Sequence, residues 1–379
     1  MFLHTIFLLL TIGYISLIIS LIIGLYHLQD GKNSQKYFVS VIVAAHNEEE
    51  NIGLCLNSLL RQTYPHELYE IIVIDDRSSD GTWEIVQKFQ ERHSKVSALR
   101  IDRSPEKMAP KKFALSRGIA SARGEIILTT DADTLPESPW IENMIRHFEP
   151  QVGMVAGFSP LDLAEKNSFF SRFIALDSLS LAAVAAGSVG LGNPLTCNGR
   201  NLGYRKKAFD EVGGFREIAR FISGDDDLLL HLIKEETDWE IRYAFDRGSL
   251  VHARQPENFS EFANQRIRHA SKGKHYSPKM VLLLSGIYFY NLLLIGYFLG
   301  SLVAPKFIFL WLTSFMAKGI ADFLLMNRFA MRYRLSYFLS SFPWAAFLHP
   351  LYVVIFGLWG QFGKFKWKGE SYEALSRDK

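Results

Sequence analysis

The chain has 379 residues, a formal net charge of +3 and 48% hydrophobic residues, including 29 Phe and 15 Tyr. This hydrophobic content is high for a soluble enzyme, and the excess lies at the two ends of the chain. The small net charge gives no indication of a nucleic-acid partner. Two cysteines, Cys55 and Cys197, provide neither a disulfide framework nor a zinc site. We expect them to be reduced thiols in a cytosol-facing domain.

Residues 2–25 form an apolar run without a charged side chain, long enough to cross a bilayer. A cleaved signal peptide would have a basic start, a shorter apolar core and a small-residue cleavage site, and this run does not fit that pattern. We therefore expect an N-terminal transmembrane anchor at residues 1–26.

Three further apolar stretches occupy the C-terminal third, at 280–303, 307–326 and 337–362. The second contains Lys318 and Asp322, which share a helix face because they are four residues apart. Charges inside a span usually face protein or a cavity. A mutual ion pair is one interpretation of these two residues, and a role in an acceptor path is the other.

Basic residues flanking the apolar stretches predict the topology, because they favour the cytoplasmic side. With the N-terminus outside, most of them lie inside, but a complete fourth span would place Lys364, Lys366 and Lys368 outside. Because Pro343 and Pro350 interrupt the last stretch, we expect the membrane region 280–362 to contain two spans plus a Pro-broken span or re-entrant hairpin. A cytoplasmic tail at 363–379 follows. The protein is thus predicted to be integral to the inner or cell membrane.

Strand-like and helix-like runs alternate in the middle of the chain. This alternation predicts an α/β fold with a mostly parallel sheet and helices on both faces. Ligands of such sheets lie beyond the carboxyl ends of the strands. The predicted strands are 40–45, 70–74, 96–101 and 125–130, and the predicted helices are 48–60, 80–89 and 111–122.

Two acidic clusters follow predicted strands. Asp131 and Asp133 suit a divalent cation that neutralises a diphosphate leaving group, although a turn rich in Asp and Thr is the alternative. Asp75 and Asp76 suit hydrogen bonds from a base or a ribose. Turn chemistry, with Asp80 as a helix N-cap, also accounts for that stretch.

Later segments have two interpretations each. The acidic run 225–227 opens an apolar helix, either as helix-dipole chemistry or with a general base in it. Gln265 and Arg268 share a helix face, where Arg can bind phosphate bidentately or face lipid headgroups. The apolar stretch Phe169–Ala186 either lies along the membrane and guides a lipid or is a core helix.

Together these clusters resemble the family 2 inverting glycosyltransferases with a GT-A fold. The resemblance implies a Rossmann-like GT-A catalytic domain at 37–275, on the cytoplasmic side. It also implies a nucleotide-sugar donor, usually a UDP-sugar, and Mg or Mn. The matching segments, in the family's order, are VSVIVAAHNEEENI at Val39, IIVIDDRSSDGT at Ile71, KKFALSRGIASARGEIILTTDAD at Lys111, NGRNLGYRKKAFDEVGGF at Asn198, SGDDDLLLHLI at Ser223 and QRIRHASKG at Gln265.

The resemblance also implies roles for single residues. Asp225 matches the general base, although Gly224 stands where the family has Glu, so that Asp226 remains an alternative. Asp131 and Asp133 match the metal and diphosphate site. The nucleotide-sugar ligands implied by the same motifs are Glu48, Asp75, Asp76, Lys111, Asp131, Gln265 and Arg268.

The acceptor is indicated by two departures. His269 replaces the Trp that, in processive polysaccharide synthases, is similar to a floor for the acceptor sugar. The tail 366–372 looks like the Trp-Lys-Gly-Arg-x-Tyr ending of lipid-acting membrane enzymes, with Glu370 for Arg. We therefore expect a lipid or lipid-linked acceptor. The alternatives are a processive exopolysaccharide synthase and a non-catalytic membrane protein with a GT-A-like binding module, which the retained acidic residues disfavour.

Overall fold

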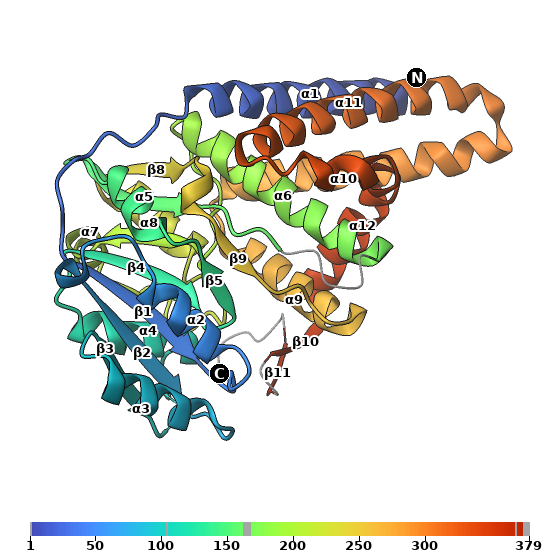
Figure 1. Ribbon diagram of the computed structural model, residues 1–379. Helices are drawn as coiled ribbons and strands as arrows, with labels where there is room; N and C mark the ends of the chain where they lie inside the picture. The colour runs from blue at the N-terminus through green and yellow to red at the C-terminus, as the bar shows by residue number, and fades with distance from the viewer. Residues whose placement is uncertain (1, 104, 162–167, 368–369, 374–379) are drawn as a thin grey trace.

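The computed structural model describes residues 2–103, 105–161, 168–367 and 370–373. It contains an α/β domain and a group of long apolar helices that come from both ends of the chain and from its middle (Figure 1). The arrangement confirms the predicted fold class, a GT-A-like sheet domain flanked by apolar helices.

A seven-stranded sheet in the order β3-β2-β1-β4-β7-β6-β8 forms the centre of the domain. The first four strands pair in parallel, and β7 alone runs antiparallel to its neighbours. The sheet is therefore mostly parallel, as predicted. Its strands are β1 (Val39–Ala45), β2 (Tyr69–Asp76), β3 (Val96–Ile101), β4 (Ile126–Asp131), β6 (Val152–Gly157), β7 (Leu202–Arg205) and β8 (Glu240–Ala244), and a separate short pair joins β5 (Thr134–Pro136) to β9 (Val251–Ala253).

The alternation of side chains along β1 explains why the sheet is covered on both faces. Val41 and Val43 pack in one hydrophobic cluster with the apolar face of α2, whereas Ile42 packs in a second cluster with α4. That second cluster continues into the apolar helices. The helices of the domain are α2 (Ile52–Leu60), α3 (Thr82–Arg92), α4 (Pro110–Ser121), α5 (Trp140–Arg146), α7 (Lys206–Glu211), α8 (Asp227–Glu236) and α9 (Phe259–Ser271).

Two helices begin later than predicted. Residues 48–51 form a turn in which the Glu48 N–H donates to the Thr82 hydroxyl, so that α2 starts at Ile52. The Asp80 carboxylate accepts from the Thr82 N–H at 3.0 Å. The Asp80 side chain therefore provides the hydrogen-bond acceptor for the first N–H group of α3, as expected of an N-cap, although Gly81 is the residue that directly precedes the helix.

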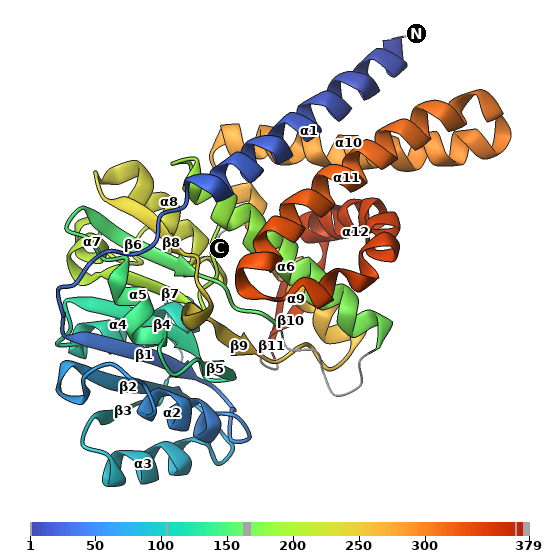
Figure 2. The same cartoon turned by 45° about the horizontal axis from the view of Figure 1, so that its top comes forward.

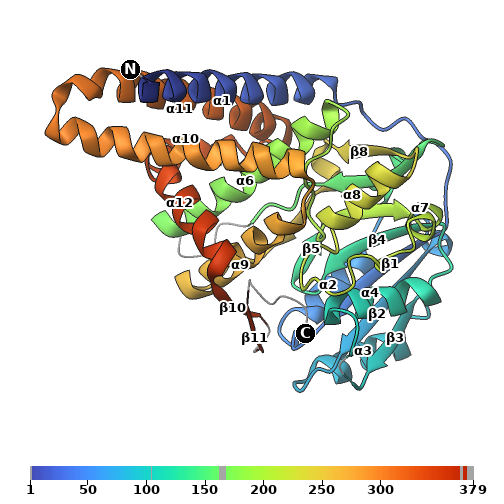
Figure 3. The same ribbon diagram turned by 180° about the vertical axis from the view of Figure 1, so that it is seen from behind.

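Among the described residues, five helices are long and apolar enough to cross a membrane. α1, α10 and α11 run together and project beyond the α/β domain, while α6 and α12 lie closer to it (Figures 2 and 3). Large apolar side chains such as Leu302 and Phe309 are exposed on the projecting helices, which is typical of lipid-facing surfaces. The five are α1 (Phe2–His27), α6 (Phe169–Gly190), α10 (Pro278–Val303), α11 (Ile308–Tyr333) and α12 (Phe342–Phe362).

Of the two arrangements expected within 337–362, a Pro-broken span and a re-entrant hairpin, the structure does not form the hairpin. α12 is a single helix from Phe342 to Phe362, with Pro343 in its first turn and Pro350 inside it. Pro343 is tolerated because the first turn needs no intrahelical N–H. A short antiparallel pair, β10 (Lys364–Trp367) and β11 (Glu370–Glu373), follows beside α9. Residues 368–369 of the predicted tail motif lie outside the described residues.

α6 packs against α1 in direct backbone contact. A Cβ atom added at Gly187 would lie 2.6 Å from the Leu21 carbonyl oxygen, and one added at Gly24 would lie 2.0 Å from the Gly187 oxygen. Small residues permit such close approach between apolar helices. In the most apolar part of α6, 67% of the residues are buried, which fits the interpretation of α6 as a core helix.

Replacing Gly187 by Leu should therefore force α1 and α6 apart. We expect a loss of about 1–3 kcal/mol in the free energy of unfolding, the usual range for an overpacked contact. Thermal unfolding of the detergent-solubilised protein measures this loss. Gly286→Leu in α10 is the matched control, because a Cβ atom there meets no atom within 4 Å. Equal stability of the two variants would contradict the close α1–α6 contact.

Candidate active site

A cavity of about 1870 Å³ begins at the carboxyl ends of β1 and β4 and extends among the apolar helices. At one end its walls include Asp76, Asp131, Asp133 and Asp225. At the other end they consist mainly of apolar side chains of α1, α6, α10 and α12. The acidic residues singled out in the sequence therefore share one space with the apolar helices.

Lys111 joins two of the predicted acidic residues. Its ammonium nitrogen lies 2.9 Å from Asp131 Oδ1 and 3.1 Å from Asp225 Oδ2. Lys111 lies in the first turn of α4, Asp131 ends β4, and Asp225 precedes α8. Three segments that are far apart in the sequence thus meet at one charged centre.

The charges at this centre stabilise one another. Burial opposes ionisation of Asp131, but the positive charge of Lys111, with Arg200 and Arg268, outweighs burial and lowers the Asp131 pKa. Burial likewise opposes the charge on Lys111, and the carboxylates of Asp131 and Asp225 outweigh it and raise the Lys111 pKa. Lys111 and Asp131 are therefore both ionised at neutral pH.

Asp131 and Asp133 supply two hard oxygen ligands at the cavity wall. Both carboxylates also act on the buried Cys55 thiol, since burial and then these two charges raise its pKa. In the described part of the chain no group of three or more His, Cys, Asp or Glu side chains is placed to hold a metal. The pair fits Mg or Mn only where diphosphate or water oxygens complete the ligand set.

The neighbours of Asp225 have structural contacts that distinguish them from it. Asp226 caps α8, because its carboxylate accepts from the Asp227 N–H at 2.8 Å and from the Gly199 N–H at 3.1 Å. Asp227 is 2% exposed and lies 2.9 Å from Lys272. Of the three aspartates, Asp225 is the one paired with Lys111, and this geometry favours it over Asp226 as the candidate base.

The two residues of the predicted nucleoside pair lie in different environments. Asp76 lines the cavity, and its Oδ1 accepts from Arg77 Nε at 2.8 Å. Asp75 is fully buried, and burial raises its pKa despite Arg100 nearby. The structure therefore brings Asp76 and Glu48 to the end of the cavity that contains Asp131 and Asp133, but not Asp75.

α9 carries the last predicted ligands. Gln265 and Arg268 both line the cavity, and the Gln265 Oε1 atom is buried without a hydrogen-bond partner. Burial, together with Lys272 and Arg268, keeps the pKa of His269 well below its usual range. The residue that replaces the expected tryptophan is therefore a neutral imidazole at pH 7.

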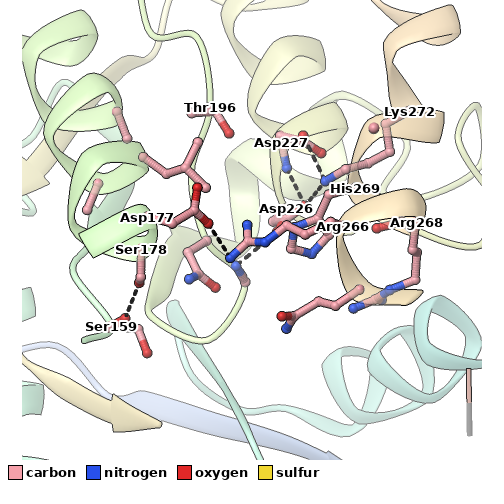
Figure 4. Close-up of a pocket in the computed structure, with 18 of the residues that line it drawn as sticks. Ser159, Asp177, Ser178, Thr196, Asp226, Asp227, Arg266, Arg268, His269 and Lys272 are labelled. Atoms are coloured by element: carbon pink, nitrogen blue, oxygen red, sulfur yellow. Dashed lines mark hydrogen bonds and ion pairs between the residues drawn. The ribbon is translucent and has the colours of Figure 1, made fainter. Parts of the chain in front are cut away.

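Among the cavity residues that were not predicted are Asp177, Arg266 and Lys272. Arg266 on α9 reaches toward Asp177 on α6, and Lys272 lies beside Asp226 and Asp227 (Figure 4). The signal available for Asp177 was the one carboxylate in the stretch Phe169–Ala186. Arg266 and Lys272 belong to the basic segment, but their acidic partners are set by tertiary packing.

Residues 40–213 match the sequence profile of glycosyl transferase family 2. This part of the chain is a glycosyl transferase family 2 domain. Asp131, Asp133 and Lys111 lie within the matched range, whereas Asp225 and the residues of α9 lie after it.

Two curated relatives are each similar to about three fifths of the chain. The chain is 32% identical over 226 residues to a beta-monoglucosyldiacylglycerol synthase of Trichormus variabilis, which is 58% of this chain and 46% of the relative. It is 29% identical over 248 residues to a poly-beta-1,6-N-acetyl-D-glucosamine synthase of Staphylococcus epidermidis, which is 62% of this chain and 54% of the relative. The chain thus spans about half the length of these relatives.

The fold has a similar solved structure. The mannosyltransferase PcManGT from Pyrobaculum calidifontis, determined in complex with GDP-Man and Mn²⁺, superimposes with a TM-score of 0.59 at 19% sequence identity. The similarity covers 94% of this chain and 99% of that one. It therefore extends over the whole arrangement of the sheet domain and the apolar helices.

Proposed function

We propose that the protein is an inverting glycosyltransferase that moves a sugar from a nucleotide-sugar, a UDP-sugar, to a hydroxyl group of a lipid or lipid-linked acceptor. The observation that carries the proposal is the continuous cavity, which joins a charged centre to an apolar interior. The sheet domain then lies on the cytoplasmic side of the cell membrane. The diacylglycerol-glucosylating relative from Trichormus variabilis supports a lipid acceptor.

The donor lies at the end of the cavity formed by the strands. Glu48 and Asp76 line the nucleoside side, and Asp131 and Asp133 face the diphosphate. Asp131 and Asp133 would hold a divalent cation there, which would supply positive charge to offset the charge on the leaving diphosphate. Lys111 and Arg268 add two positive charges beside Asp131. Gln265 contributes an unpartnered amide oxygen to the same space.

Asp225 removes the acceptor proton. The acceptor oxygen forms a bond to the anomeric carbon from the face opposite the diphosphate, while the bond from that carbon to the diphosphate oxygen breaks. The proton passes to the Asp225 carboxylate, and the nucleoside diphosphate leaves. Attack from the opposite face inverts the configuration at the anomeric carbon. The Lys111 ion pair places the Asp225 carboxylate next to the diphosphate site.

Removal of divalent metal tests the role of Asp131 and Asp133. We expect EDTA to weaken nucleotide-sugar binding at least about tenfold, or roughly 1.4 kcal/mol, because the diphosphate charge is then poorly compensated. Isothermal titration with a UDP-sugar, with EDTA and after Mn²⁺ is restored, measures the change. Asp131→Asn should bind weakly in both conditions, whereas the exposed Asp102→Asn should behave as wild type. Binding that is unchanged by EDTA would contradict the metal role.

A processive exopolysaccharide synthase is the second candidate, favoured by the relative from Staphylococcus epidermidis. The two functions differ in their products. Mass spectrometry of membrane lipids should show one added sugar in cells with the wild-type protein if the enzyme makes a single transfer, and no such product in cells with the Asp225→Asn protein. A ladder of polymers with the wild-type protein would support the synthase instead.

A further inference from the structure

The middle of the cavity contains a buried ion pair that the proposed reaction does not use. Arg266 on α9 and Asp177 on α6 are 6% and 9% exposed, and their side chains approach to 2.5 Å. Both residues line the cavity, as does Tyr352 on α12, which interacts with the Asp177 carboxylate. Three helices from distant parts of the sequence thus contribute to one polar group in the cavity, of which Figure 4 shows Asp177 and Arg266.

This polar group retains unused hydrogen-bonding capacity. The Arg266 Nε atom is buried and has no hydrogen-bond partner, and the neighbouring Gln265 Oε1 atom is in the same condition. Leaving a buried donor unsatisfied costs free energy, so such atoms are uncommon without a functional reason. A ligand oxygen in the cavity is a suitable partner for the Arg266 N–H group.

We call the part of the cavity that is lined by the apolar helices the inner cavity. Each charged side chain there has a partner of opposite charge. Among the described residues that line it from α1, α6, α10, α11 and α12, the formally charged side chains are Asp177 and Asp322. Asp322 pairs with Lys318 at 2.5 Å and accepts from the Tyr14 hydroxyl at 2.8 Å. This confirms the mutual ion pair expected from the sequence. Each inner carboxylate therefore has its own cation.

Balanced charge decides which acceptor head group suits this part of the cavity. A lipid phosphate would lie beside Asp177 and Asp322 without an unpaired cation from these helices to offset its charge. A phosphate nucleophile is also already ionised, and so does not need a base such as Asp225. An uncharged head group with hydroxyl or ester oxygens brings no negative charge next to the carboxylates, and its hydroxyl needs a base. Its oxygens can also accept a hydrogen bond from Arg266.

We propose that Asp177, Arg266 and Tyr352 form an acceptor subsite for an uncharged, oxygen-bearing lipid head group. The subsite holds the head group so that its reactive hydroxyl lies toward Asp225 and its acyl chains lie among α10 and α12. This inference rests on the proposed function and narrows its acceptor to neutral lipids. These three side chains are positioning residues, since they hold the acceptor and do not touch the reacting bond.

The test uses the full-length protein in detergent micelles with UDP-sugars and two acceptors, diacylglycerol and polyprenyl phosphate. The wild-type protein should transfer sugar to diacylglycerol in preference to polyprenyl phosphate. Asp177→Asn should raise the KM for diacylglycerol about tenfold, the scale expected when a buried polar group loses its partner. The KM for the UDP-sugar should stay unchanged, and so should the rate of its slow hydrolysis by water, which releases UDP. Because Arg266 is then uncompensated, polyprenyl phosphate should become a better acceptor.

Tyr352→Phe is the second variant, because it removes one hydroxyl and keeps the ring. It should raise the diacylglycerol KM severalfold, and Tyr337→Phe, an exposed tyrosine outside the cavity, should not. Preference of the wild type for polyprenyl phosphate, or an unchanged acceptor KM in folded Asp177→Asn and Tyr352→Phe, would overturn the subsite. Absence of both transfer and UDP release in the wild type would instead remove the proposed function, and the subsite with it.

Discussion

Asp225→Asn is expected to lower the rate of sugar transfer by about 100- to 10,000-fold, the usual contribution of a positioned general base. Asparagine keeps the size of the side chain but cannot take up the proton of the attacking hydroxyl group. Donor binding should persist, because Asp131, Asp133 and Arg268 are unchanged. Initial rates with a labelled UDP-sugar, together with the Kd of the donor, measure the two effects separately.

Asp226→Asn is the matched comparison for Asp225→Asn. Asp226 caps α8 and accepts from the Gly199 N–H, so its replacement should lower stability by about 1 kcal/mol while transfer at low temperature remains. The two variants have the same chemical change in adjacent residues. A folded Asp226→Asn protein without activity, beside an active Asp225→Asn protein, would move the base to Asp226.

Lys272→Met is expected to produce the largest loss of stability. The ammonium of Lys272 is 2.9 Å from Asp227 and 3.5 Å from Asp226, and its side chain is 10% exposed. Removing it leaves the buried Asp227 carboxylate and the partly buried Asp226 carboxylate without this cation, and breaking a buried pair costs about 3–5 kcal/mol. Thermal or urea unfolding in detergent measures the loss. Lys207→Met, whose side chain is 75% exposed, is the control and should change stability little.

The loss in Lys272→Met should depend on pH. Burial already raises the pKa of Asp227 to about 6 in the folded protein, and loss of Lys272 should raise it further. A carboxyl group whose folded pKa lies above the unfolded value of about 3.9 favours folding while it is protonated, and this contribution is lost as the pH rises through the folded pKa. The stability deficit should therefore be larger at pH 8 than at pH 5. A pH-independent deficit would contradict the assignment of Lys272 as the counterion.

The sequence by itself determined the first four strands of the sheet domain, the helices between them and the order of the site motifs. β1 and β2 are short apolar, β-branched runs, and their local preference agrees with their place in the sheet. Asp131 was predicted at the end of a strand, and it ends β4. Position after a parallel strand is enough to bring a residue to the ligand edge of the sheet.

Tertiary packing decided which carboxylates meet and which are hidden. Asp75 and Asp76 are adjacent in sequence, yet one is fully buried and the other lines the cavity, since successive side chains of β2 face opposite sides. Asp225 and Asp226 are likewise adjacent, and their roles separate because Lys111 approaches one and Lys272 the other. No local pattern specifies which lysine reaches which aspartate.

For the apolar helices, too, the sequence determined some features and tertiary packing decided others. Composition and length predicted α1, α10, α11 and α12 as long apolar segments, because a bilayer-length apolar run is a local property. The continuity of α12 through Pro350, the Gly24–Gly187 contact and the Asp177–Arg266 ion pair depend on which helices pack together. The sequence therefore determined which polar residues make up the candidate site, and the packing of distant helices decided the shape and charge of the cavity that leads to it.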